Sequence, residues 1–225
     1  MKSIQAKDHT EGMHALASRI SSALMQDQKV LWLICGGSNI PTAVEAMNEI
    51  RKSVPAEKIS QLTVAQTDER YGPVDHPDSN WKQMQDDGFD FSGIRFIPIL
   101  EGKPLEETIT GYEQAIRPIF EKTLASGGIV IGQFGMGEDG HIAGILPHTK
   151  AVTDPRFISG YAGNPFTRIT LTPSALMKIS AAYAFVFGSS KAAAIKHLRE
   201  EVLPLEDEPA QILKSMKEAY LYSDQ

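Results

Sequence analysis

Disulfide bonds and membrane spans are excluded at once, because this sequence of 225 residues has a single cysteine and no apolar run that approaches the thickness of a bilayer. The cysteine, Cys35, ends a short apolar run, so we expect a buried, inert thiol rather than a nucleophile. The N-terminus lacks the apolar core of a secretory signal. These absences predict a cytoplasmic protein that does not bind membranes.

Positive charge is also scarce. The sequence has 22 Lys and Arg residues against 28 Asp and Glu residues, which gives a net charge of −6. Without a stripe of Lys and Arg, the electrostatic footprint of a nucleic-acid-binding protein is missing. No group of side chains has metal-ligand spacing, so we expect no metal. A small anion could still be held by a local cationic pocket.

Short apolar runs alternate with helical patterns along the chain. The apolar runs predict strands at 30–35, 62–67, 96–100, 129–134 and 183–187, with a further alternating segment at 169–172. Helical spacing predicts helices at about 9–26, 42–51, 106–124 and 188–201, and another after residue 80. The segment 135–166 is expected to be looser. This alternation, without linker or repeat, predicts a single α/β domain over residues 1–225, with a mainly parallel sheet and helices on both faces.

Chemically active residues are concentrated in the loops that follow four of these strands, which end at Cys35, Thr67, Phe134 and Phe187. The carboxyl ends of parallel strands meet at one edge of a sheet, where ligands bind in open α/β folds. We therefore expect the four loops to converge on one crevice.

The loop after the strand at 129–134 carries Asp139 and His141 two positions apart. A carboxylate and an imidazole so close can form an acid/base pair, although such pairs also occur as purely structural contacts. The loop is dense in glycine, which costs backbone entropy without packing gain and favours close approach of a ligand; these glycines are Gly135, Gly137, Gly140 and Gly144. Surface or packing roles are expected for the remaining histidines: His9, His14, His76, His148 and His197.

Two other loops have features of an anion site. Gly37 and Ser38 precede a helix and could present free N–H groups, although the same pattern also forms ordinary tight turns. Lys191 lies in the first turn of a helix, where the macrodipole disfavours a cation unless an anion is bound; the alternative is a lysine that extends into solvent. Arg168 could add a guanidinium fork for a phosphate, or be an ordinary surface arginine.

Three charged residues, Asp68, Glu69 and Arg70, directly follow the strand at 62–67. Such a run usually forms a solvated loop. Here Gly72 and Pro73 restrict the loop, and the strand end directs it toward the crevice. Which of the three faces a substrate stays open.

Together these segments resemble the 6-phosphogluconolactonases, within a larger group that includes the glucosamine-6-phosphate deaminase/isomerases. The matching segments span nearly the whole chain in the family's order: 36–38, 68–70, 78–80, 135–141, 168–172, 188–191 and 208–210. Two departures are Asn39 and Ile40 between Ser38 and Pro41, and Glu138 where a proline is usual. The resemblance implies a Rossmann-like fold and a sugar-phosphate ligand.

The same resemblance implies roles for single residues. Ser38, Arg168 and Lys191 would hold the phosphate, and Asp139 and His141 would stand at the reacting carbon. We further expect Gly37 and Asp68 to contact the substrate, and Arg70 or nearby backbone N–H groups to stabilise an oxyanion. No cofactor is implied.

The choice between the two branches depends mainly on Leu146. The deaminase branch has a glutamate there that supports the histidine, and leucine cannot move a proton. Asp68-Glu69-Arg70 also matches the lactonase branch better than the Asp-Glu-Tyr of many deaminases. We therefore expect hydrolysis of 6-phosphogluconolactone, a step of the pentose phosphate pathway. The alternatives are a sugar-phosphate deaminase or isomerase, and a non-catalytic sugar-phosphate-binding regulator. The sequence does not specify an oligomeric state.

Overall fold

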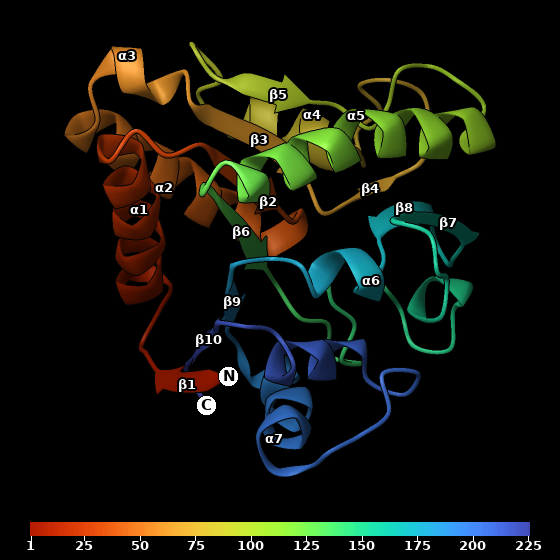
Figure 1. Ribbon diagram of the computed structural model, residues 1–225. Coiled ribbons are helices and arrows are strands. Elements are labelled where there is room, and N and C mark those ends of the chain that lie inside the picture. Colours follow the sequence, from red (N-terminus) through yellow and green to blue (C-terminus); the bar gives the residue numbers. More distant parts are fainter.

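The computed structural model describes residues 1–225 and contains a seven-stranded sheet in the order β1-β10-β9-β6-β2-β3-β5 (Figure 1). All neighbouring strands in it are parallel, as predicted. The strands are β1 (Lys2–Gln5), β2 (Val30–Ile34), β3 (Leu62–Gln66), β5 (Arg95–Ile97), β6 (Ile129–Phe134), β9 (Ala181–Val186) and β10 (Ala219–Ser223).

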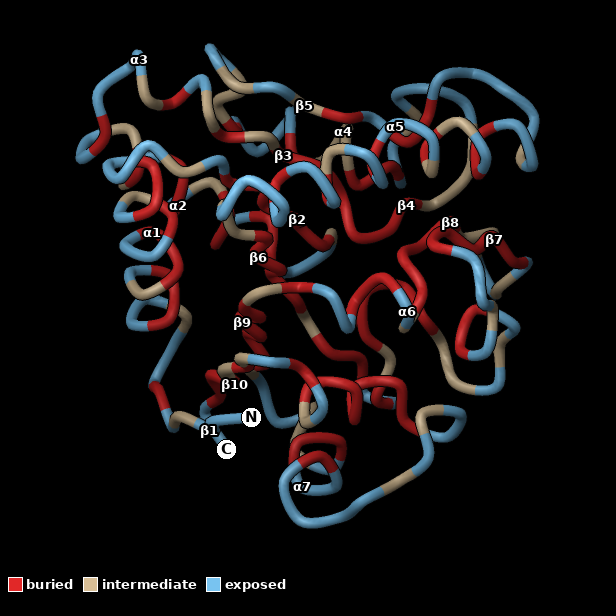
Figure 2. Tube along the Cα trace, viewed as in Figure 1, coloured by how far each residue is buried: buried red, intermediate tan, exposed pale blue.

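The central strands are buried on both faces. In β2, Trp32 and Ile34 pack into one hydrophobic core, whereas Leu31 and Leu33 pack into the other. Successive side chains of a strand point to opposite faces, so a continuous apolar run requires a cover on each side. Figure 2 shows these strands as the buried centre of the molecule.

Helices supply both covers, which confirms the predicted α/β fold. One core includes side chains from α1 (Thr10–Met25), α2 (Ile40–Ser53) and α4 (Asn80–Asp86). The opposite core includes side chains from α5 (Leu105–Ala125), α6 (Pro173–Leu176) and α7 (Ala192–Glu200). A short helix, α3 (Ala56–Ile59), precedes β3. None of these helices has the length and apolarity needed to cross a membrane.

A second, antiparallel sheet was not predicted. It has the order β4-β8-β7 and comprises β4 (Asp68–Arg70), β8 (Thr167–Leu171) and β7 (Ile158–Ala162). The expectation of a loop at 68–70 was wrong, and so was that of a looser segment through 158–162. Charged residues have low strand propensity, but β4 gains ladder hydrogen bonds by pairing with β8. The alternating segment near 169 is a strand as predicted, but it belongs to this sheet.

Smaller differences occur at the ends of elements. The edge strand β1 and its neighbour β10 were not predicted, because β1 is short and polar and draws its order from pairing with β10. Strand β5 ends at Ile97 instead of residue 100, since Pro98 has no N–H to donate to a ladder. The other strands and the long helices agree with the predicted ranges within a few residues.

After β2, the chain first adds strands on one side of the large sheet and then returns to add strands on the other side, so the strand order reverses between β2 and β6. Strands β3 and β5 lie on one side of β2, whereas β6, β9, β10 and β1 lie on the other. Loops that leave adjacent strands in opposite directions open a crevice at the carboxyl edge of the sheet.

Candidate active site

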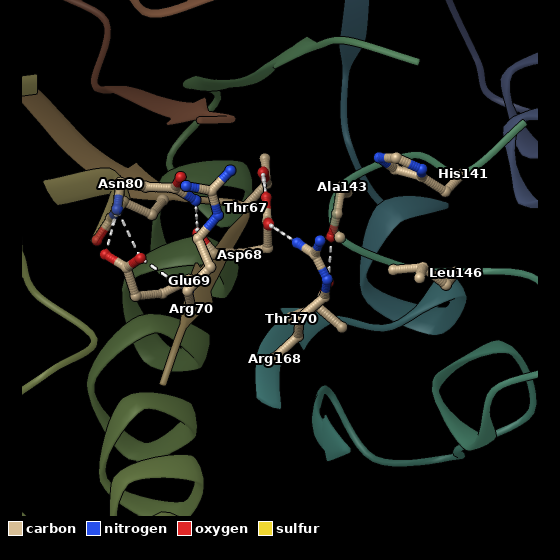
Figure 3. A network of polar contacts seen from close by, with 12 residues as sticks. Thr67, Asp68, Glu69, Arg70, Asn80, His141, Ala143, Leu146, Arg168 and Thr170 are labelled. Carbon is tan, nitrogen blue, oxygen red and sulfur yellow. Dashed lines mark hydrogen bonds and ion pairs between the residues drawn. The ribbon is translucent and has the colours of Figure 1, made fainter. Parts of the chain in front are cut away.

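A cleft of about 250 Å³ lies at this crevice. The loops after β2, β3, β6 and β9 all contribute to it, so their predicted convergence is confirmed. Of the eight site residues predicted from the sequence, all but Asp139 line the cleft: Gly37, Ser38, Asp68, Arg70, His141, Arg168 and Lys191. Figure 3 shows His141 on one side and Arg70 on the other, with Asp68 and Arg168 between them.

Asp139 contacts the cleft indirectly, through His141. Its Oδ1 lies 2.6 Å from Nδ1 of His141 and also accepts a hydrogen bond from the His141 backbone N–H at 3.2 Å. The hydrogen bond from the His141 side chain lowers the pKa of Asp139 to about 2, against the opposing effect of burial. An ionised Asp139 requires a proton on Nδ1, which leaves the lone pair of a neutral imidazole on Nε2.

The glycines of this loop make room for protein side chains. A Cβ on Gly137 would lie 2.0 Å from Nδ1 of His141 and 2.4 Å from Oδ1 of Asp139. Gly140 has φ +74°, and a Cβ there would lie 2.3 Å from Cγ of Glu208. The prediction that glycine brings no packing gain here was therefore wrong, because the missing side chains allow the Asp139–His141 pair and Glu208 to pack closely.

The antiparallel sheet contributes two arginines to the cleft. Arg70 and Arg168 are directly paired across β4 and β8. Nη1 of Arg168 lies 3.9 Å from Oδ2 of Asp68, whereas Nη1 of Arg70 donates to the carbonyl of Asp78 and its guanidinium lies over the ring of Phe166. Nε of each arginine is buried without a hydrogen-bond partner. Two arginines on neighbouring strands thus line the cleft with their Nε donors unused.

The structure also answers which of residues 68–70 face the cleft. Asp68 and Arg70 line it, whereas Glu69 is fully buried outside it, as expected for alternate residues of a strand. The Glu69 carboxylate accepts five hydrogen bonds, from Nε2 of Gln66, Oγ of Ser79 and the backbone N–H groups of Arg70, Asn80 and Trp81. Glu69 therefore ties β4 to the start of α4.

The cleft lining also includes an open backbone segment and a lysine. Gly37 has φ +69° and no atom within 4 Å of where its Cβ would lie; it begins the 3-10 turn η1 (Gly37–Asn39), which leads into α2. Lys191 ends the turn η3 (Ser189–Lys191) at the start of α7, and its side chain makes no hydrogen bond or ion pair with the protein. Both segments line the same cleft.

These features were compared with known proteins. A family model described as glucosamine-6-phosphate isomerases/6-phosphogluconolactonase matches residues 6–221. The chain belongs to this family. It is 28% identical over 210 residues to a 6-phosphogluconolactonase from Synechocystis, which covers 87% of this chain and 80% of the relative.

Two solved structures show the same fold. A 6-phosphogluconolactonase from Thermotoga maritima has a TM-score of 0.76 at 18% identity, with 99% of this chain and 98% of that chain covered. A monomeric glucosamine-6-phosphate deaminase has a TM-score of 0.81 at 21% identity, with 100% and 98% covered. The fold is thus common to lactonases and deaminases, and the chemistry must be argued from side chains.

Leu146, on which the choice between lactonase and deaminase depends, is not among the residues that line the cleft. Leu146 is half-buried and packs against the larger core. The segment around it is held by the antiparallel sheet, since Oη of Tyr161 donates to the carbonyl of Gly144 and Oγ1 of Thr170 donates to that of Ala143. The only carboxylate among the residues that do line the cleft is that of Asp68.

Two asparagines of the cleft were not among the predicted site residues. Asn80 was part of a segment that carried the family resemblance, and Asn39 was noted only as a departure from it; both line the cleft. Cys35 lines it too and is buried as predicted, and burial raises the pKa of its thiol far above the usual range. No histidine other than His141 lines the cleft, although His76 lies 2.9 Å from the carbonyl of Arg70 and so supports β4.

Proposed function

We propose that this protein hydrolyses 6-phosphogluconolactone to 6-phosphogluconate. The observation that carries the proposal is the Asp139–His141 pair at a cleft whose other charged groups include Arg70, Arg168 and Lys191. The pair can activate water, and the cations suit a phosphorylated substrate. Family membership supports a sugar-phosphate ligand.

In the proposed reaction, His141 acts first as a general base. Nε2 takes a proton from a water molecule as the water oxygen attacks the ester carbonyl, and the carbonyl oxygen becomes an oxyanion. Asp139 holds the ring and stabilises the imidazolium that forms, as its hydrogen bond to Nδ1 requires. The bond from the carbonyl carbon to the ring oxygen then breaks, and Nε2 returns the proton to that oxygen. General base catalysis of this kind contributes ~10²–10⁴-fold.

The cations have separate tasks in this scheme. Arg70 donates to the oxyanion, which is the charge that develops in the transition state. Arg168, Lys191, Gly37 and Ser38 bind and orient the phosphate, and Asp68 contacts the sugar and fixes Arg168. The proton transfers use side chains of this chain, so the scheme requires neither a metal nor a cofactor.

The decisive assay uses freshly generated 6-phosphogluconolactone, and acid release is followed above the spontaneous rate. We expect catalysed hydrolysis by the parent and almost none by His141→Ala. Glucosamine 6-phosphate serves as the second substrate, and no ammonia should be released from it, because Leu146 cannot assist ring opening.

Ammonia release without lactone hydrolysis would replace the proposal by a deaminase. Tight binding of 6-phosphogluconate with no turnover of either substrate would indicate a non-catalytic sugar-phosphate-binding regulator instead.

A further inference from the structure

Three contacts of one kind join three of the segments that form the cleft. In each, a buried polar side chain from one segment occupies the space that a Cβ would need on a glycine of another segment. The segments are 36–39, 68–80 and 135–144. The contacts are Asn80 with Gly36, Asn39 with Gly135, and Asp68 with Gly144.

The contact of Asn80 with Gly36 is the closest. Oδ1 of Asn80 lies 1.8 Å from the position of a Cβ on Gly36, accepts no hydrogen bond and is buried. The rest of Asn80 is fixed, since Nδ2 donates to the carbonyl of Asp68 at 3.0 Å and the backbone N–H donates to Glu69 at 2.7 Å. Figure 3 shows Asn80 beside Glu69 and the strand that carries Asp68 and Arg70.

The other two contacts complete the set. Nδ2 of Asn39 lies 2.4 Å from the position of a Cβ on Gly135, and the carbonyl of Asn39 accepts a hydrogen bond from Gln133 at 2.9 Å. Oδ2 of Asp68 lies 2.5 Å from the position of a Cβ on Gly144. Each of the three segments therefore touches both of the others.

We propose that these three contacts set the distance between the phosphate end of the cleft and His141, and that Asn80 and Asn39 are positioning residues for the reaction. Three segments joined pairwise cannot shift relative to one another without compressing one of the contacts or opening a void beside it, and a closely packed interior resists both. The inference rests on the proposed function, because it assigns these residues a purpose in orienting a substrate that is held at both ends.

Gly36 offers a test that separates packing from backbone conformation. Its φ is −84° and its ψ −166°, which alanine adopts without strain, so Gly36→Ala is opposed by Asn80 and not by the chain itself. We expect Gly36→Ala to lower kcat by ~10²-fold, the effect of a displacement of about 1 Å. In Gly36→Ala/Asn80→Ala the new methyl group occupies the vacated space, and kcat should recover about tenfold, within the range of couplings between residues in contact.

Three further variants test whether the contact between Asn80 and Gly36 causes the change in kcat. Asn80→Ala alone should lower kcat while the Kd for 6-phosphogluconate, measured by calorimetry, stays within about threefold, because the phosphate contacts remain. Asn80→Asp fills the same space without the amide donor to Asp68 and should lie between Asn80→Ala and the parent. Gly111→Ala on α5, where the nearest atom is 4.0 Å away, is the matched control and should not change kcat.

Additive losses in the double variant, with all proteins folded, would overturn the proposal. So would an Asn80→Ala variant that loses 6-phosphogluconate affinity at unchanged kcat. If Gly36→Ala does not fold, recovery of folding in the double variant supports the contact, and Asn80→Ala still measures its effect on kcat. If the parent fails to hydrolyse the lactone, the same cycle is measured in the free energy of unfolding, where absence of coupling between positions 36 and 80 overturns this inference independently of the reaction.

Discussion

The two sheets of this protein differ in what they contribute. In the parallel sheet, β2 and β9 consist entirely of buried apolar residues, and their chemistry lies only in the loops that follow them. In the antiparallel sheet, β4 and β8 themselves place Asp68, Arg70 and Arg168 in the cleft. A single residue, Thr67, separates β3 from β4, so the two sheets are held in a fixed relation at the active site.

We expect the parallel sheet to contribute mainly to stability and the antiparallel sheet mainly to ligand binding. The parallel sheet buries apolar area on both faces, which is the main source of folding free energy. In the antiparallel sheet, two strand positions are occupied by arginines, Arg70 and Arg168, whose Nε atoms have no hydrogen-bond partner in the protein. Substitutions in the first should lower the free energy of unfolding, and substitutions in the second should lower affinity.

We expect the largest effect on activity outside both sheets, in the loop after β6 that carries His141. His141→Ala should lower kcat by ~10²–10⁴-fold and leave 6-phosphogluconate affinity within a few-fold, because the base acts mainly in the transition state. Asp139→Asn should cost less, since it alters the orientation of His141 without removing it. Steady-state kinetics above the spontaneous rate provide the measurement. A larger loss for Asp139→Asn than for His141→Ala would make Asp139 the base.

The parallel sheet is tested by Leu33→Ala. Leu33 is fully buried in β2, so its truncation should lower the free energy of unfolding by about 2–5 kcal/mol through lost transfer free energy and a cavity. KM should not change in the folded fraction. Urea unfolding and kinetics on one preparation measure both quantities, and a raised KM with unchanged stability would contradict the division between the sheets.

The antiparallel sheet is tested by Arg168→Ala. Loss of charge-assisted hydrogen bonds worth about 1.5–3 kcal/mol should weaken 6-phosphogluconate binding about 10- to 100-fold and mainly raise KM. Lys191→Ala, in a loop of the parallel sheet, should act in the same way. Calorimetry provides the affinities. Parental affinity in both variants would place the phosphate elsewhere.

The smallest effect is expected from pH. The pKa of Asp139 is lowered to about 2 by the hydrogen bond from His141, so the pair stabilises the fold above the unfolded pKa of about 3.9 and loses that contribution as pH falls toward 2. The effect is small because the Asp139 side chain is half-exposed. The difference in unfolding free energy between the parent and Asp139→Asn, measured in urea, should shrink from pH 5 to pH 3. A constant difference would exclude the linkage.

The same comparison explains what could be predicted from sequence. Runs such as 30–35 and 129–134 reveal buried parallel strands because both faces need apolar residues. Asp68-Glu69-Arg70 shows no such pattern, since β4 is ordered by its pairing with β8 and by donors to Glu69, three of which come from residues 79–81, ten or more positions along the chain. Most cleft residues could be identified because their types and motifs carry chemistry. Asn39 and Asn80 could not be identified, because their role depends on packing against Gly135 and Gly36, which are distant in the sequence and become neighbours only in the fold.

The position of Cys35 has a practical consequence. It is the chain's only thiol, and it lies in the cleft wall next to Gly36. Burial raises the pKa of the Cys35 thiol, so the thiolate forms only in molecules whose cleft wall has opened. An electrophilic reagent that reacts with thiolates can therefore modify Cys35 only in those molecules. The rate of labelling under native conditions therefore reports the free energy of that opening at a single site, and a bound sugar phosphate should slow the labelling in proportion to its occupancy.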